Sequence, residues 1–438
     1  MVSVANSSCL TQEFQWTERN RRLDALGLFS VDLAKAKRGL IDADSPLSNL
    51  PEYFTQHPVY VPASQIEIME DFIALLGERS RSLKYQTALR QHWPGKKNPW
   101  LASLQQESLG VFFGYDFHLS EQGPKLIEIN TNAGGAYLNY LLSTGQSPCC
   151  HSALKYIQQP LAPEFFEQHV VDSFHQEYFL GKGRVLSSIA IVDEAPNKQF
   201  LHQEFLLFQQ LFQAAGIETY ILSPDELTLR RGKLYFGNRV IDLVYNRLTD
   251  FYFLDAASKT LREALLQNAA VITPNPMHYS CLADKSLLVL LNDSEFLLDA
   301  GFSHDEQLLI HSVVPKTSFV SGFDAEKLWQ QRKNYFFKPR NGFGSRASYS
   351  GRKLTKKTFS QILQSDYLVQ EYVPAEVREI DKDGGKESFK TDLRIYTYGS
   401  EPLLMAARMY QGQTTNMRTQ GGGFAPVLQL NRLDGEQS

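Results

Sequence analysis

The stretch from Gly114 to Gly135, GYDFHLSEQGPKLIEINTNAGG, constrains this chain more than any other part of its sequence. It predicts two short strands around a turn, because the apolar runs FHL and KLIEIN flank the turn-forming residues SEQGP. Glu128 and Asn130 lie two residues apart on the second strand, so their side chains leave the same face. If the hairpin closes around its turn, Asp116 comes to lie opposite this pair.

Two carboxylates and an amide that converge on one point repel one another unless a cation lies between them. All-oxygen ligation suits Mg²⁺ or Mn²⁺ rather than zinc, so we expect Asp116, Glu128 and Asn130 to hold such an ion. For this pattern alone, an exposed hairpin with ordinary polar side chains is the alternative. The glycines that follow, Gly134 and Gly135, favour a ligand site because they let a backbone approach a ligand closely.

The composition is that of a globular protein without a nucleic-acid or membrane signature. A chain of 438 residues has room for two or three domains, and 43% hydrophobic with 21% charged residues is typical of soluble proteins. A net charge of −4 argues against nucleic-acid partners, and no apolar run is long enough to span a membrane. The four cysteines and the lack of a signal-peptide pattern lead us to expect a cytoplasmic protein.

Strand and helix patterns alternate from about residue 184 to 281, which predicts a parallel sheet. The turn after its first strand, APNKQ, lacks the glycines of a dinucleotide-binding fold, so we expect this part to help form a substrate cleft. Arg247, at the end of a predicted strand, is its best ligand candidate. A surface salt bridge is the alternative for that residue.

The C-terminal part carries two lysines and a glycine-rich loop. Residues 282–300 are expected to form a helix with Lys285 near its start. In YFFKPRNGFGSR, Lys338 ends an aromatic strand, and backbone N–H groups of the following loop can lie over phosphates. A plain hairpin turn is the alternative, and the loop is not a Walker P-loop because the lysine precedes its glycines.

A further strand, YLVQEYV at 367–373, runs into Pro374, and its apolar end with free backbone groups suits adenine. Glu371 could serve the ribose or the amino group of the base. The strands that follow carry several basic residues, Arg394 and Arg408 among them. Such residues on strands usually lie on solvated faces, but here they could equally balance a triphosphate or an acyl phosphate.

Taken in order, these segments resemble the nucleotide-binding module of the ATP-grasp ligases, and Asp-x11-Glu-x-Asn is similar to the metal signature of that superfamily. Because the signature precedes the other segments here, the chain resembles a circularly permuted ATP-grasp ligase such as eukaryotic glutathione synthetase or glutathionylspermidine synthetase. The resemblance covers about 110–145 and 184–427. It implies an α+β and α/β architecture, namely a permuted ATP-grasp fold with a parallel-sheet pre-ATP-grasp substrate domain. We expect the divisions 1–183 (a helical region with the metal-binding part), 184–281 (the substrate domain) and 282–438 (the nucleotide-binding domain).

The resemblance also implies four sets of site residues. ATP would be bound by Lys285, Lys338, Gly342, Phe343, Gly344, Ser345, Gln370, Glu371 and Val373. Magnesium would be held by Asp116, Glu128 and Asn130. Catalysis would fall to Arg394, Arg408 and Arg418, and substrate binding to Asn132, Gly134, Gly135, Arg247 and Asn416.

The implied function is an ATP-dependent carboxylate–amine ligase that works through an acyl phosphate on a small amino-acid or peptide-like substrate. ATP and Mg²⁺ are the expected cofactors, with two ions and with Mn²⁺ as a possible substitute, and a homodimer is possible. A non-catalytic nucleotide-binding scaffold and a small-molecule kinase are the alternatives. Two departures argue against simple glutathione synthesis. The permuted ligases have an arginine where this chain has Gly114, and eukaryotic glutathione synthetase has a metal-binding glutamate where this chain has Asn341-Gly342.

Overall fold

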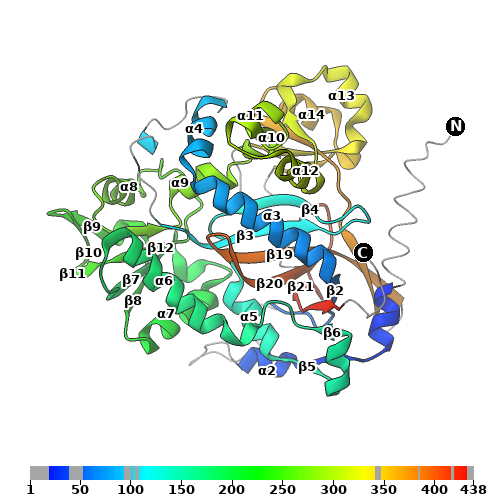
Figure 1. Ribbon diagram of the computed structural model, residues 1–438, viewed down its shortest axis with the longest axis horizontal. Helices are drawn as coiled ribbons and strands as arrows, with labels where there is room; N and C mark the ends of the chain where they lie inside the picture. The colour runs from blue at the N-terminus through cyan, green and yellow to red at the C-terminus, as the bar shows by residue number, and fades with distance from the viewer. Residues whose placement is uncertain are drawn as a thin grey trace.

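A computed structural model describes residues 19–38, 53–92, 100–101, 104, 108–340, 347–382, 385–415 and 419–431 of the chain. Its centre is a six-stranded antiparallel sheet in the order β21-β20-β19-β3-β4, with β18 also paired to β19 (Figure 1). These strands are β3 (Val111–His118), β4 (Lys125–Asn130), β18 (Glu376–Lys382), β19 (Gly385–Tyr398), β20 (Glu401–Tyr410) and β21 (Gly423–Ala425).

The predicted hairpin exists and joins strands that lie far away in the sequence. Residues of β3 and β4 pair with each other, and β3 also pairs with β19, in which Arg394 is opposite Asp116. The expectation that 114–135 shares a sheet with 385–410 is therefore confirmed. The sequence from Leu101 to Phe113 also fits a short helix that leads into the strand at Asp116, but β3 already starts at Val111, so this interpretation is wrong at its end. Circular permutation itself stays a prediction.

Side chains alternate along these strands, so one face of the sheet is apolar and polar side chains lie at the centre of the opposite face. Tyr115 and Phe117 of β3 point with Leu393 and Ile395 of β19 into a core that α3 covers. The intervening residues of the same strands, which include Asp116 and Asp392, therefore point to the opposite face.

Two helices follow each other where the periodicity predicts one helical segment from Ser64 to about Leu89. They are α3 (Ala63–Arg81) and α4 (Leu83–His92). Between them Ser82 has an extended backbone, and its hydroxyl accepts the N–H of Tyr85 at 3.1 Å, so this serine caps the second helix.

The expected parallel sheet is confirmed, in the order β13-β12-β7-β8. Apolar residues on its two faces belong to two different clusters, so both faces are covered, as parallel sheets require. Its elements are α6 (Phe166–Lys182), β7 (Ser188–Val192), α7 (His202–Ala214), β8 (Glu218–Leu222), β12 (Leu243–Asn246), α8 (Lys259–Leu266) and β13 (Val271–Thr273). A small antiparallel meander beside it comprises β9 (Leu227–Arg230), β10 (Lys233–Phe236) and β11 (Arg239–Ile241).

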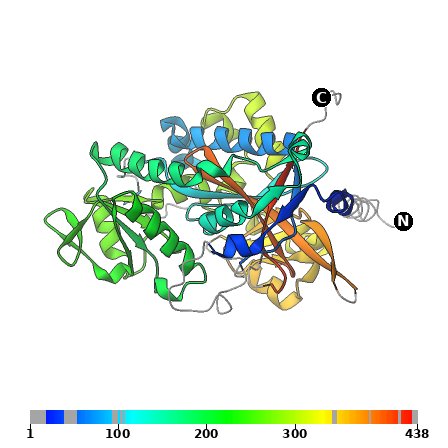
Figure 2. The ribbon, with the colours of Figure 1, turned by 90° about the horizontal axis from the view of Figure 1, so that it is seen from below.

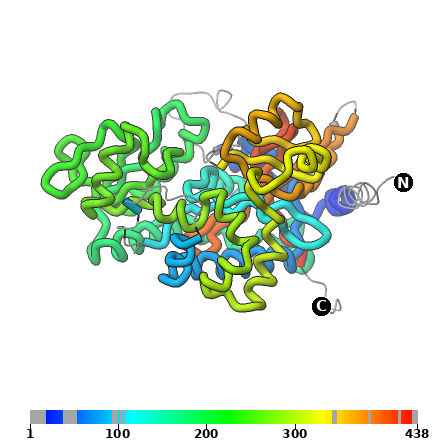
Figure 3. Tube along the Cα trace, turned by 90° about the horizontal axis from the view of Figure 1, so that it is seen from above, coloured from blue at the N-terminus to red at the C-terminus, as the bar shows by residue number. Residues whose placement is uncertain are grey.

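A second antiparallel sheet has the order β14-β17-β15-β16 and packs one face against two helices. Its elements are β14 (Thr317–Phe319), α13 (Ala325–Gln331), β15 (Tyr335–Pro339), β16 (Tyr349–Ser350), α14 (Lys356–Leu363) and β17 (Tyr367–Glu371). Figures 2 and 3 show this yellow-to-orange part and the green parallel sheet as separate parts of the molecule, on either side of the central sheet.

The expected helix over 282–300 is wrong as a single element. A π-helical turn (Tyr279–Ala283) precedes it, Lys285 lies in a turn, and two short helices follow, α10 (Leu287–Leu290) and α11 (Ser294–Asp299). Carboxylates interrupt the apolar run: Asp284 accepts the N–H of Ser286 at 2.9 Å, and Asp293 caps α11. The helix α12 (His304–Val313) leads from there to β14.

The sequence from Ala136 to about Phe179 predicts helix over most of its length, but this segment is only partly helical. The helix α5 (Ala136–Thr144) is confirmed, but the strands β5 (Gln146–Pro148) and β6 (Ile157–Gln158) separate it from α6. These strands complete small sheets with β1 (Phe29–Val31) and with β2 (Val59–Pro62) and β22 (Val427–Leu430), near α2 (Leu33–Arg38). No helix in the described parts of the chain is long and apolar enough to cross a membrane.

Candidate active site

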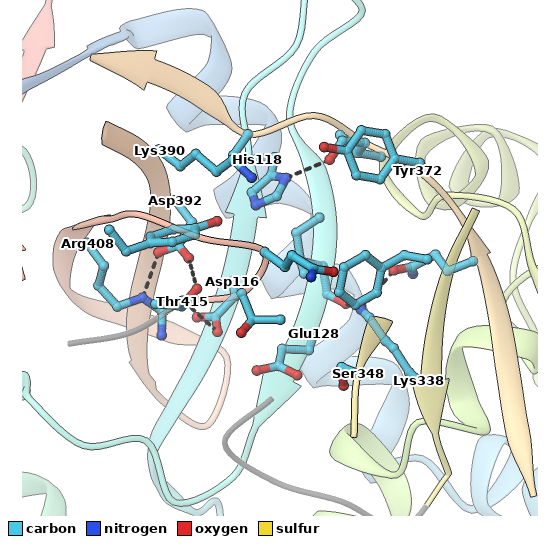
Figure 4. A pocket seen from close by; sticks show the side chains of 18 of the residues that line it. Asp116, His118, Glu128, Lys338, Ser348, Tyr372, Lys390, Asp392, Arg408 and Thr415 are labelled. Carbon is cyan, nitrogen blue, oxygen red and sulfur yellow. Dashed lines mark hydrogen bonds and ion pairs between the residues drawn. The ribbon is translucent and has the colours of Figure 1, made fainter. Parts of the chain in front are cut away.

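A pocket lies where the central sheet meets the second antiparallel sheet (Figure 4). Its walls come from three parts of the chain: β3 with β4, β15 with β17, and β19 with β20, and the first of these is far from the other two in the sequence. Seven of the predicted site residues line it, namely Asp116, Glu128, Lys338, Gln370, Glu371, Val373 and Arg408.

The predicted metal residues do converge. Asp116 and Glu128 are direct partners across the hairpin, and Asn130 is the partner of Gly114 on the same face. The Asn130 amide donates to Asp116 at 3.2 Å and to Glu128 at 3.4 Å. The three side chains therefore form one hydrogen-bonded polar group, and Asp116 and Glu128 of this group line the pocket.

Asp116 is already neutralised by two arginines. Its Oδ1 accepts from Nε of Arg394 at 2.6 Å, and its Oδ2 lies 2.7 Å from Nη2 of Arg394 and 2.9 Å from Nη2 of Arg408. Burial by itself raises the pKa of Asp116, but the two guanidinium groups outweigh burial and hold that pKa below its ordinary value. At neutral pH this carboxylate is ionised and its lone pairs are committed to the arginines.

The charge pattern continues onto the next strand. Arg408 lies directly opposite Asp392, and its Nε donates to that carboxylate at 2.6 Å. Thr415 donates its hydroxyl to the other oxygen of Asp392, also at 2.6 Å (Figure 4). Arg408 is thus held by two carboxylates, and within the described chain its Nη1 has no partner. Because Arg408 lines the pocket, this nitrogen remains for an anionic ligand.

Glycine at position 114 makes room for this arrangement. A Cβ atom there would lie 3.1 Å from Cδ and Nε of Arg394 and 2.6 Å from the Cβ of Ala133. A side chain at this position would clash with Ala133 and would crowd the part of Arg394 that holds its guanidinium group against Asp116. The permuted ligases have an arginine at this position. Here the glycine leaves room for Arg394, an arginine that β19 supplies.

Lys338 bridges the two sheets at the pocket wall. Its Nζ donates to the carbonyl oxygen of Ile127 at 2.7 Å and to Oε1 of Gln370 at 2.8 Å. The pairing of β3 with β4 shifts register at Ile127, which leaves that residue without a direct partner and its carbonyl oxygen turned to the lysine. The pKa of Lys338 is lowered to about 8, chiefly by burial and also by nearby Lys285, while Glu128 and Asp116 oppose this shift.

Four of the predicted substrate residues lie at the junction with the parallel sheet rather than in the pocket. Arg247 donates to the Ala133 carbonyl oxygen at 2.8 Å and to the Tyr245 hydroxyl at 2.9 Å. Asn132 donates to the carbonyl oxygens of Arg247 and Leu248. These contacts make Arg247 a buried tie between the parallel sheet and the loop that follows β4.

The two predicted glycines lie in the same junction. Glu204, buried in α7, accepts the backbone N–H of Gly135 at 2.9 Å and that of Tyr137 at 3.1 Å, and so caps α5. The Gly134 carbonyl oxygen accepts from the Tyr396 hydroxyl at 2.7 Å and faces Arg394. The junction is therefore linked to the charged floor of the pocket.

Several predicted residues cannot be placed. Gly342, Phe343, Gly344, Ser345, Asn416 and Arg418 lie outside the described residues. Conversely, the pocket is also lined by residues that were not predicted, namely His118, Phe336, Tyr372, Ala375, Lys390, Asp392 and Tyr410. The same alternation that links Asp116 to one face of β3 could have indicated His118, two residues later.

The comparison with solved structures identifies the fold. The chain matches a glutathione synthetase-like effector (GSS30) from Globodera pallida with a TM-score of 0.56 and 12% identity, over 95% of this chain and 94% of that chain. A putative gamma-glutamylcysteine synthetase from Methylobacillus flagellatus KT matches with a TM-score of 0.44 and 11% identity, over 79% and 84%. The ATP-grasp ligase PsnB matches with a TM-score of 0.31 and 13% identity, over 55% and 89%.

The chain has a glutathione synthetase-like ATP-grasp fold, as its sequence predicted. The first of these likenesses spans nearly the whole of both chains, and at 12% identity it concerns the fold alone. No protein-family model matches the sequence, and the comparison with curated proteins finds no matching relative.

We expect Asp116→Asn to destabilise the protein by about 3–5 kcal/mol, because the change leaves two buried guanidinium groups without their shared anion. Urea unfolding of the variant and of Glu121→Gln, an exposed carboxylate in the turn of the same hairpin, measures the effect. Equal stabilities of the two variants would show that Asp116 is not the counter-ion of the arginines.

The lowered pKa of Lys338 predicts a pH dependence for anion binding. The ammonium is charged below about pH 8 and loses its proton above it, so affinity for a nucleotide triphosphate should fall by up to about tenfold per pH unit above that value. Titration calorimetry between pH 7 and 9.5 measures this, and Lys338→Arg, which stays charged, should have a flat profile. A similar slope in both proteins would show that a group other than Lys338 causes the pH dependence.

Proposed function

We propose that this protein is an ATP-dependent carboxylate–amine ligase that activates a small amino-acid or peptide-like acid as an acyl phosphate. One observation carries the proposal. Three parts of the chain bring Glu128, Lys338 and Arg408 around one pocket, in a chain with a glutathione synthetase-like ATP-grasp fold. Carboxylate, ammonium and guanidinium groups at one end of a pocket suit the transfer of a phosphoryl group.

The two ends of the pocket differ in chemistry, and the difference supports a nucleotide in one orientation. Figure 4 shows Asp116, Glu128 and Lys338 toward one end, and His118 with Tyr372 and Lys390 toward the other. The second end belongs to the link between β17 and β18, which also lines the pocket with Val373 and Ala375. A base would fit against the strand link at this end, and the phosphates would then reach Lys338 and Arg408.

The oxygen donors fit a divalent cation in part. Glu128 and Asn130 offer hard oxygen ligands, which suit Mg²⁺ when phosphate oxygens complete its shell. Asp116 fits poorly, because both of its oxygens already accept from arginines. Within the described residues, no three His, Cys, Asp or Glu side chains are grouped to hold a metal. We therefore propose Glu128 and Asn130 as the ligands, and the bound ion would neutralise phosphate charge.

The residues of the chain would act by positioning and by electrostatics. Arg408, fixed by Asp116 and Asp392, would donate to the phosphoryl group or to the carboxylate that receives it. Lys338 would place a second positive charge nearby, and Gln370 would keep its ammonium in place. The amine then attacks the acyl phosphate, phosphate leaves, and an amide forms. No side chain has to act as a nucleophile in this reaction.

A nucleotide-binding protein without turnover is the second candidate. The observation that favours it is the pairing of Asp116 with two arginines, which leaves fewer carboxylates for metal ions than the sequence pattern predicts. Release of ADP on addition of pooled amino acids, γ-glutamyl peptides and polyamines distinguishes the two functions. A kinase would release ADP with an acid alone, whereas a ligase needs the amine as well.

We expect Glu128→Gln to lower ATP turnover by about 10²–10³-fold while leaving the fold intact, because it removes the main anionic ligand of the proposed ion. Glu121→Gln in the same hairpin is the matched control and should retain full activity. Coupled measurement of ADP release under saturating substrate tests both variants. Wild-type turnover in Glu128→Gln would remove Glu128 from the reaction.

A further inference from the structure

His118 contacts the link between β17 and β18 at one end of the pocket. Its Nδ1 lies 3.0 Å from the carbonyl oxygen of Val373 (Figure 4). A carbonyl oxygen can only accept, so Nδ1 carries the hydrogen in this contact. In the neutral ring the other nitrogen, Nε2, is then unprotonated and acts as an acceptor.

The environment of His118 keeps this tautomer in place. Burial lowers the pKa of the imidazole, so the ring is neutral at pH 7. Within the described parts of the chain Nε2 has no hydrogen-bond partner, and the ring lines the pocket. The pocket therefore has a fixed acceptor contributed by a side chain of β3.

The backbone of the strand link offers one donor, the N–H of Val373, beside a carbonyl oxygen that His118 already occupies. The N–H groups of Glu371 and Tyr372 already donate to the carbonyl oxygens of Lys316 and Asn334, both at 2.8 Å. The N–H of Val373 has no backbone acceptor among the described residues, while its carbonyl oxygen is occupied by His118. The next residue is a proline and has no N–H.

We propose that His118 is a specificity-determining residue that reads the nucleobase: its Nε2 accepts a hydrogen bond from the exocyclic amino group of a 6-aminopurine. The N–H of Val373 donates to the neighbouring ring nitrogen of the base. Nε2 of the imidazole thus serves as the acceptor for the base in place of the Val373 carbonyl oxygen, which His118 occupies. This inference rests on the proposed binding of a nucleotide in this pocket.

This combination of one acceptor, Nε2 of His118, and one donor, the N–H of Val373, discriminates against 6-oxopurines. Such a base presents an oxygen to Nε2, which is also an acceptor, and a ring N–H to the donor of Val373. Both contacts are mismatched, and an unsatisfied pair in a partly buried site weakens binding by more than the loss of one bond. We therefore expect ATP to bind at least tenfold more tightly than inosine triphosphate.

A cycle of protein and ligand changes tests the role of His118. Affinities of wild type, His118→Phe and His118→Gln are measured by calorimetry for ATP and for purine riboside triphosphate, which lacks only the amino group. In the wild type we expect the loss of this group to weaken binding about fivefold to tenfold. In His118→Phe the ratio should fall to about one. His118→Gln should restore it, because its amide can donate to Val373 and accept from the base.

The ratio separates a binding role from a structural one. If His118 had only a structural role, its replacement would weaken the binding of both nucleotides equally and leave the ratio of their affinities at the wild-type value. That result would overturn the inference. If the wild type binds neither nucleotide, the proposed function fails, and the inference fails with it. ¹⁵N NMR of the wild type requires no variant: Nε2 should shift on addition of ATP and much less on addition of the purine analogue. Equal shifts would also overturn the proposal.

Discussion

A balance of buried charges across neighbouring strands holds the floor of the pocket together. Arg408 pairs with Asp392 between β20 and β19, and Arg394 pairs with Asp116 between β19 and β3. Any one of these groups alone would be strongly unfavourable away from water, but as alternating pairs they offset one another. The register of the strands sets the pairs, and a slip by one residue would turn them all to the apolar face.

This balance determines which groups are available to a ligand. With Asp116 neutralised, Glu128 is the carboxylate of the hairpin that still faces the pocket without an arginine partner among the described residues. The two carboxylates that flank Arg408 orient its guanidinium group toward the pocket, where Lys338 adds a second cation. The floor therefore suits a polyanion, and the base must meet the other end of the pocket, where His118 contacts the strand link.

Local patterns predicted much of this fold, because strand alternation and turn residues act within a few positions. The hairpin, the parallel sheet and the paired strands of the C-terminal part are all found. The helix around Lys285 was wrong, because two aspartates that cap short elements interrupt an apolar run. Ser82 divided another helix in the same way. In both places a local side-chain hydrogen bond to the backbone decided the structure against the periodicity.

The site was predicted less completely because its chemistry depends on contacts over long sequence distances. Asp116 was recognised as a pocket residue, but its partner Arg394 is 278 residues away, and only the register of β3 with β19 brings them together. Arg247 was placed correctly at a strand end, yet tertiary packing buried it as a tie to the loop after β4. His118 lies on the predicted face, and alternation alone would have found it.

A crystal structure of the protein with a non-hydrolysable ATP analogue and Mn²⁺ tests the central claim most directly, because anomalous scattering locates the metal independently. Our account predicts the triphosphate beside Lys338 and Arg408, the base next to His118 and Val373, and the metal on Glu128 and Asn130. Asp116 should keep both arginines in that complex. A nucleotide bound elsewhere, or a metal held by Asp116 with its arginines displaced, would contradict the account.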